Sequence, residues 1–332
     1  MKLRIFYYLF LAVISLSCLD KVTVPIRQET EKLVVEGGIS NDSTAYSVKL
    51  SLTRQFGNSF EISPVRGAVL TISDNLSSVI LRASPLEAGV YRVPSKQLIG
   101  KPGQIYTLNI KLPDGREYVS SPEKMPLPVP ISKVYAQFNG GVNTGYQVFV
   151  DVKDPASTEN FYRWTAFSIY KRKTTGIAVG FGGRCCDVCW IRTTNNEPNL
   201  FSDANVNGGL LQKRPVIFSP VFAFTPHYVE VTQQSLTREA YQFWKRYQEQ
   251  FTRTGSIFDP TPAPILGNVV NKSQVDDIAL GYFSASSVSR GRVVIPDTLA
   301  GKIIINPLYI PEGDCARVYS FGVYDLYPPP GW

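Results

Sequence analysis

The sequence predicts a mainly β protein, with an N-terminal immunoglobulin-like β-sandwich followed by a larger β-rich domain that carries one inserted amphipathic helix. Short apolar segments separated by turn residues recur along most of the chain, which is the pattern of successive strands. Aromatic residues make up 12% of the chain and are mostly Tyr and Phe, which favour strands together with Val, Ile and Thr. The length of 332 residues and the hydrophobic content of 44% support two packed domains.

The first domain is expected over residues 32–124, where about seven short strands and no helical stretch are predicted. The turn from Pro113 to Gly115 has a clear basis, because Pro presets one φ angle and Gly takes a positive one. No cysteine falls between Cys18 and Cys185, so this sandwich has no inter-sheet disulfide. The clearest alternation of apolar and polar residues is carried by Tyr46, Val48, Leu50 and Leu52.

A proline-rich linker over residues 125–130 marks the predicted domain boundary, because alternate prolines impose extended backbone and remove donors for strand pairing. The β-rich domain then covers residues 131–332, with its helix near 237–253. Ser235 or Thr237 is expected to cap that helix. One helix face is predicted to pack on the sheet, and its apolar residues are Ala240, Trp244, Tyr247 and Phe251.

The N-terminus has the order of a bacterial lipoprotein signal over residues 1–17: two basic residues, an apolar run too short to span a bilayer, and small residues before Cys18. Cys18 is therefore the predicted lipidation site, and residues 18–31 form a polar tether. The usual lipobox has Leu where this chain has Ser15, so an ordinary cleavable signal peptide is the alternative. Either interpretation places the remaining chain outside the cytoplasm.

The charge pattern does not indicate a nucleic-acid partner. The formal net charge is +7, and the basic residues are scattered. The densest run is Lys171 to Lys173, which is better explained as a solvated face. No second long apolar run follows the signal, so no other membrane-spanning segment is expected.

Four cysteines are the sharpest chemical feature of the exported chain: Cys185, Cys186, Cys189 and Cys315. Two disulfides are the simplest expectation outside the cytoplasm. A bond between adjacent cysteines strains the backbone, so we expect one of Cys185 and Cys186 to pair with Cys189 and the other with Cys315. A zinc site, a redox dithiol and incomplete pairing of the thiols are the alternatives.

Catalytic and cofactor motifs are not found, so no catalytic residue, metal ligand or cofactor is predicted. His227 is the only histidine, which removes most metal and histidine-based schemes, and a structural role is expected for it. No Gly-x-Ser-x-Gly elbow is present, and the glycines near residue 182 lack the context of a phosphate loop. Asp276 and Asp277 are more simply a turn than a Ca²⁺ site or an acid–base pair.

A loop rich in proline near residues 255–264 presents Ile257 and Phe258, which we assign as a candidate contact for a partner. The competing interpretation is that Phe258 packs in the core beneath the helix.

Ten segments spread over essentially the whole mature length carry a family resemblance: 33–37, 67–72, 89–91, 102–108, 161–164, 240–244, 256–260, 267–268, 280–285 and 330–332. In their order and spacing they resemble the domain-of-unknown-function family 4249, lipoproteins of Bacteroidota. The resemblance implies an outer-membrane lipoprotein, often encoded beside a TonB-dependent receptor, with no established biochemical activity.

The function expected from these observations is non-enzymatic: an accessory or binding partner of a TonB-dependent receptor or another envelope assembly. The protein would be lipid-anchored in the outer membrane, in its periplasmic or cell-surface leaflet. A surface glycan- or peptide-binding module is the alternative, followed by a hydrolase whose carboxylates are assembled by the fold.

Overall fold

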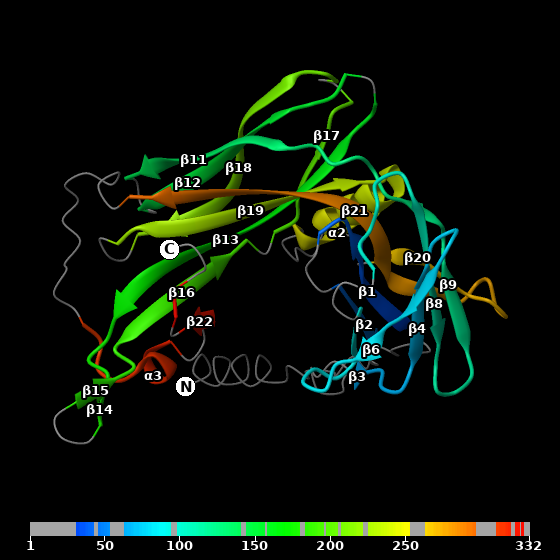
Figure 1. Cartoon of the computed structure of the whole chain (residues 1–332), viewed down its shortest axis with the longest axis horizontal. Coiled ribbons are helices and arrows are strands. Elements are labelled where there is room, and N and C mark those ends of the chain that lie inside the picture. Colours follow the sequence, from blue (N-terminus) through cyan, green and yellow to red (C-terminus); the bar gives the residue numbers. More distant parts are fainter. Residues whose placement is uncertain are drawn as a thin grey trace, which may run out of the picture.

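The computed structural model shows a mainly β protein, in which long strands on one side meet a group of shorter strands on the other (Figure 1). The predicted signal segment 1–17, Cys18 and the tether up to residue 30 lie outside the described residues, as do Ile257 and Phe258. The structure describes residues 31–42, 46–53, 63–93, 98–140, 144–156, 158–179, 183–195, 197–204, 207–221, 225–252, 263–296, 310–319, 323–325 and 327–328.

The N-terminal unit consists of the first ten strands together with β20 and the first half of β21. These strands are β1 (Leu33–Ser40), β2 (Ser47–Leu52), β3 (Ser63–Pro64), β4 (Val69–Ser73), β5 (Ser78–Ile80), β6 (Arg82–Ala83), β7 (Val90–Arg92), β8 (Ile105–Lys111), β9 (Glu117–Ser120), β10 (Glu123–Lys124), β20 (Leu266–Asn271) and β21 (Ile278–Ile295).

A nearly closed sheet runs through this unit in the order β2, β1, β21, β20, β9, β8 and β4. The β1–β21 pair is parallel and runs from Val34 opposite Leu280 to Ser40 opposite Ser286, whereas the other pairs are antiparallel. Gly281 permits this pairing, because it has a φ of 79° and a Cβ there would lie 2.1 Å from the Val35 carbonyl oxygen.

The hydrophobic core of the N-terminal unit combines residues from the first strands with residues of β20 and β21. Alternating residues of β1 and β2 are buried, as period-two patterning requires. The chain leaves this core near the predicted linker 125–130, and residues 263–286 return to it. The buried members that come from the C-terminal half are Val269, Ala279, Phe283 and Ala285.

The C-terminal unit is formed by the strands from β11 to β19 with the second half of β21 and β22. Their bounds are β11 (Ile131–Asn139), β12 (Gly145–Lys153), β13 (Phe161–Lys173), β14 (Ile177–Val179), β15 (Gly183–Cys185), β16 (Val188–Thr194), β17 (Asn199–Ser202), β18 (Leu210–Pro220), β19 (His227–Leu236) and β22 (Val323–Asp325).

Two layers pack together in this unit. The first is the three-stranded sheet β11–β12–β18, and the second is the sheet in which β21, β19, β13, β16 and β22 are paired in that order. Their shared core contains apolar residues of β12, β13, β18 and β19, with Tyr162 and Trp164 among the largest buried side chains. The single strand β21 thus belongs to both units and joins them.

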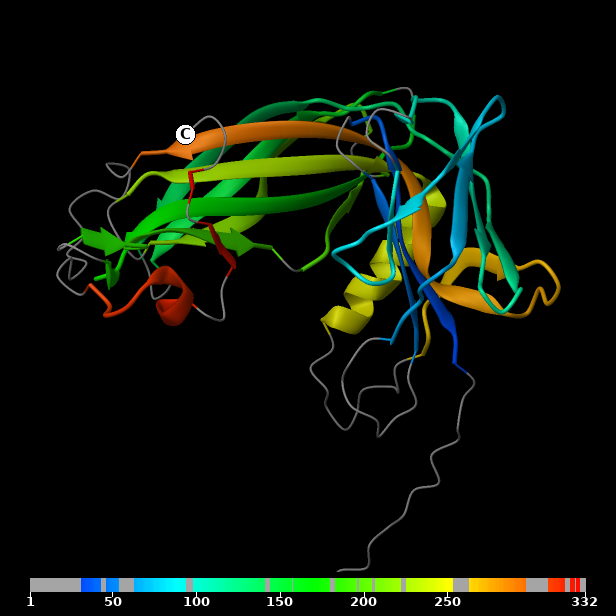
Figure 2. The same ribbon diagram turned by 60° about the horizontal axis from the view of Figure 1, so that its bottom comes forward.

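A helix lies where the sequence places one: α2 (Arg238–Phe251), which follows β19. Thr237 caps it, since its hydroxyl accepts a hydrogen bond from the Ala240 backbone N–H. Figure 2 shows α2 at the junction of the two units.

The expectation that the whole apolar face of α2 packs on the sheet is wrong. Ala240 and Phe243 are buried, but Tyr247 and Phe251 are 42% and 46% exposed. The cause is that the supporting contacts lie near the start of the helix, where Phe243 packs against Tyr282 with ring centroids 5.1 Å apart. The later turns therefore leave their aromatic rings accessible.

Candidate functional site

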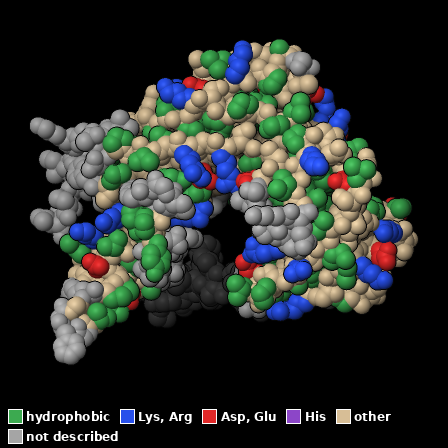
Figure 3. Space-filling view, in the orientation of Figure 1, with side chains coloured by type: hydrophobic (Ala, Val, Ile, Leu, Met, Phe, Trp, Pro, Cys, Tyr) green, Lys and Arg blue, Asp and Glu red, His purple; other side chains and the backbone are tan. Residues whose placement is uncertain are grey.

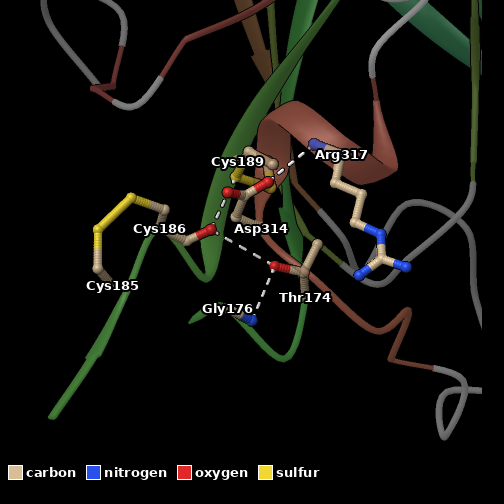
Figure 4. Close-up of a disulfide and its surroundings, with 8 residues drawn as sticks. Thr174, Gly176, Cys185, Cys186, Cys189, Asp314 and Arg317 are labelled. Atoms are coloured by element: carbon tan, nitrogen blue, oxygen red, sulfur yellow. Dashed lines mark hydrogen bonds between the residues drawn. A yellow bond between two sulfur atoms is a disulfide. The ribbon is translucent and has the colours of Figure 1, made fainter. Parts of the chain in front are cut away.

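The four cysteines form two disulfides, but the expected pairing is wrong. Cys189 is bonded to Cys315, across a sequence separation of 126, and Cys185 is bonded to the adjacent Cys186 (Figure 4). The backbone explains the difference: Cys186 has a φ of 63°, in the turn between β15 and β16, and Cys189 lies in β16 against the buried Cys315.

The cysteine cluster secures the C-terminal segment rather than forming an open site. The Cys186 carbonyl oxygen accepts a hydrogen bond from the Cys315 backbone N–H at 3.2 Å, and Asp314 caps the short helix α3 (Cys315–Val318). In the part of the chain that the structure describes, no group of three or more His, Cys, Asp and Glu side chains is placed to hold a metal ion.

His227 is fully buried in the C-terminal unit. Its Nδ1 lies 2.7 Å from the Ser219 hydroxyl oxygen, and its ring stacks on Tyr170 with centroids 4.8 Å apart. Burial lowers the pKa of His227 to about 4. A neutral, shielded imidazole beside a shielded serine has no route to a substrate, so this geometry is structural.

The carboxylates singled out by the sequence, Asp276 and Asp277, are not paired for acid–base chemistry. Asp277 accepts hydrogen bonds from the Tyr118 hydroxyl at 2.6 Å and from Asn271 Nδ2 at 2.9 Å. Burial tends to raise the pKa of Asp277, but these hydrogen bonds and nearby cations hold it below its usual value. The residue therefore stabilises the turn after β20.

A second carboxylate pair, Asp154 and Asp203, was not singled out by the sequence. Both side chains are buried. Burial raises the pKa of Asp203, and the neighbouring Asp154 adds to the rise. Neither residue lines the main cavity described next, so this pair lacks the access that a hydrolase needs.

A cavity of about 790 Å³ lies where β1, β2, β19, β21 and α2 meet. We call it the junction cavity. Figure 3 shows this face of the molecule hollowed between the two units. Its apolar walls are Val34, Ile39, Phe243, Trp244, Tyr247, Ile265, Leu280, Tyr282 and Val288, and its charged residues are Glu36, Asp42, Arg163 and Arg290.

The charged residues around Arg290 in the junction cavity form ion pairs with one another. Arg290 pairs with Asp42 and, at 2.8 Å, with Glu230, and Glu230 also pairs at 2.8 Å with Arg292. Glu230 is buried and accepts a further hydrogen bond from the Tyr228 hydroxyl. Hydrogen bonds to Glu230 and Asp42 outweigh burial and raise the pKa of Arg290.

A second arginine of the junction cavity, Arg163 on β13, lies on the same sheet face as Arg290 and has no carboxylate of the described residues within ion-pair distance. The Arg163 guanidinium stacks on Trp244, with its Cζ 3.6 Å from the ring centroid, and its Nη1 donates to Gln234 Oε1 at 3.2 Å. Its Nε is shielded from solvent and has no hydrogen-bond partner in the described structure. Burial lowers the pKa of Arg163 to about 10.

Sequence reasoning missed Arg163 as a site residue. A signal was present, because Arg163 stands between two large aromatic residues that are buried, Tyr162 and Trp164. Burying a charged side chain without a partner costs free energy, so an arginine between buried residues is expected to have either an ion-pair partner or a functional role. Neither could be assigned from sequence, since its contacts Gln234 and Trp244 lie far along the chain.

These features define a two-unit β protein with a cavity at the junction of its units. The chain belongs to the family described as domain of unknown function DUF4249, whose sequence profile matches residues 20–292. No curated protein matches the chain. Within the described residues, no helix combines the length and apolar character needed to cross a membrane.

Proposed function

We propose that this protein is a non-enzymatic binding protein of the outer membrane, held there by lipid on Cys18, and that it binds its partner at the junction cavity. The observation that carries the proposal is the cavity itself, which has apolar and aromatic walls and an Arg163 cation with no carboxylate of the described residues within ion-pair distance. Such a mixture of apolar surface and a few fixed polar groups is typical of binding sites.

The proposed partner is a TonB-dependent receptor or another envelope assembly, in keeping with the family resemblance. Confinement to one membrane raises the effective concentration of the two proteins, so modest affinity suffices. The segment that contains Ile257 and Phe258 follows α2, and cavity-lining residues stand on both sides of it: Gln250 before it and Ala263 after it. We therefore propose that this segment contributes to the same contact.

The proposal is tested by purifying the native protein from outer membranes in mild detergent. We expect a TonB-dependent receptor to co-purify, and we expect Tyr247→Ser to weaken the association. Leu86→Ser is the matched control, because Leu86 is 91% exposed on the N-terminal unit and does not line the cavity. Purification of a lone monomer would contradict the proposed partner.

The anchor needs its own test. Cys18→Ala should abolish labelling by a palmitate analogue and release the protein from membranes. Unchanged labelling would contradict lipidation at Cys18 without affecting the junction cavity.

A surface peptide- or glycan-binding module is the second candidate, and the aromatic rings of α2 favour it. Trp244, Tyr247 and Phe251 follow one another along the helix, with ring centroids of 5.6 Å and 6.5 Å between successive pairs. Titration with oligosaccharides and peptides, followed by tryptophan fluorescence, tests this candidate. Turnover of either ligand would instead support the hydrolase alternative.

We also propose an immunoglobulin-like sandwich layout for the N-terminal unit, with α2 as an insertion between β19 and β20. Antiparallel pairing of β4 with β8 and of β8 with β9 supports this layout.

A further inference from the structure

The Arg163 guanidinium is oriented by contacts on two sides. Trp244 covers its face, and Gln234 accepts from Nη1. Nε is shielded from solvent, so Nη2 is the remaining donor of the guanidinium, and it makes no hydrogen bond to a described residue. A guanidinium N–H without a protein acceptor can donate a charge-assisted hydrogen bond to a carboxylate.

Carboxylates already present in the junction cavity do not satisfy Arg163. Asp42 pairs with Arg290, and Glu36 pairs with Lys49 at 3.9 Å. No carboxylate of the described residues lies within ion-pair distance of Arg163. A partly buried cation without a counter-charge is costly, so a bound anion would relieve this cost.

The size and chemistry of the walls limit the anion further. The cavity of about 790 Å³ is far larger than a carboxylate group, and it falls in the range of sites for organic ligands. Beyond Arg163 its walls include Ile265 and Leu280 and the accessible ring of Tyr247. A ligand body with an aromatic or aliphatic group would bury these surfaces.

We infer that the junction cavity binds an organic carboxylate, with the carboxylate hydrogen-bonded to Nη2 of Arg163 and its apolar body along Tyr247 and Leu280. The inference rests on the proposal that this cavity is the binding site, and it names the ligand chemistry. The carboxylate belongs either to a small acid or to the C-terminus of a polypeptide, and both present the same group to Arg163.

Calorimetric titration of the purified, signal-free protein tests the inference with paired probes. N-acetyl-L-phenylalanine should bind at least tenfold more tightly than its uncharged amide, and a hexapeptide that ends in Phe should bind more tightly than its amidated form. These comparisons use the wild-type protein, so they do not depend on the folding of a variant. Equal binding of acid and amide, or binding of neither, would overturn the inference.

Variants then locate the carboxylate. Arg163→Gln should lose at least tenfold in affinity for both acids, and Arg163→Lys should recover part of it, because Lys keeps the charge but loses the fork. Arg238→Gln is the matched control: Arg238 pairs with Glu159 and does not line the cavity. Unchanged affinity in Arg163→Gln would also overturn the inference.

The two acid probes distinguish the sources. Tighter binding of the hexapeptide supports a polypeptide C-terminus, and equal binding supports a small acid. Carboxylate binding without a co-purifying membrane protein would contradict only the proposed receptor partner, whereas co-purification without carboxylate binding would contradict only this inference.

Discussion

Two arginines that line the junction cavity, Arg290 and Arg163, differ in their electrostatic surroundings. Arg290, on β21, is held between Asp42 and the buried Glu230, and Glu230 also binds Arg292. Arg163, on β13, has an aromatic ring and one amide oxygen as its partners. The charge of Arg290 is therefore neutralised by carboxylates, whereas Arg163 has no carboxylate of the described residues within ion-pair distance.

The difference shows which arginine the fold needs for its own stability. A paired cation stabilises the protein, because losing it leaves a buried carboxylate less well satisfied. An unpaired and partly buried cation costs stability, and such cost is common where a side chain serves binding. We therefore assign Arg290 to structure and Arg163 to ligand binding.

The largest expected effect concerns His227. The comparison of the two arginines assumes that burying an unpaired positive charge in this protein costs free energy, and the titration of His227 measures that cost. The pKa of His227 is lowered from 6.5 to about 4 by burial alone. In the unfolded chain His227 is protonated below about pH 6.5, whereas in the folded protein it is protonated only below about pH 4. The free energy of unfolding therefore falls as the pH drops from 6.5 to 4. The loss should reach about 3 kcal/mol.

Proton NMR measures this directly, because His227 is the only histidine and gives a single ring titration. The His227→Gln variant is the control, and its free energy of unfolding should depend less on pH between 6.5 and 4. A titration midpoint near 6.5 in the folded protein would show that the interior tolerates the cation.

The next prediction tests the ion pairs that Glu230 makes with Arg290 and Arg292. Glu230→Gln keeps the shape but removes the charge that Arg290 and Arg292 share, so an amide N–H₂ group faces a guanidinium. Because both arginines are partly exposed, we expect a loss of about 2 kcal/mol rather than the full cost of a buried, unpaired charge. Urea unfolding measures it, and a loss below 0.5 kcal/mol, a threshold of roughly the size of an ordinary surface substitution, would break the comparison.

Local features of the fold were predictable from sequence. Period-two alternation of Val48 and Leu50 correctly predicted a buried strand face. A cap was expected at Ser235 or Thr237, and Thr237 is the residue that caps α2. These features depend on neighbouring residues, so one segment is enough to predict them. The mainly β class follows from many such segments.

Pairings between distant residues were not predictable. Asn41, which follows β1, accepts a hydrogen bond from the Val288 backbone N–H across 247 residues, next to the parallel β1–β21 pairing. The Cys189–Cys315 disulfide likewise depends on two segments far apart in the sequence lying side by side. The binding role proposed for Arg163 depends on its contact with Trp244 on α2, and this contact could not be predicted from either segment alone.

The most direct measurement compares the free energies of unfolding of Arg163→Met and Arg290→Met with that of the wild type. Met keeps an apolar stem of similar length in both places. Arg290→Met should lose about 1 kcal/mol, since Glu230 and Asp42 lose a partner. Arg163→Met should change by less than about 0.5 kcal/mol or gain stability, because it removes an unpaired cation. Equal losses in the two variants would contradict the account.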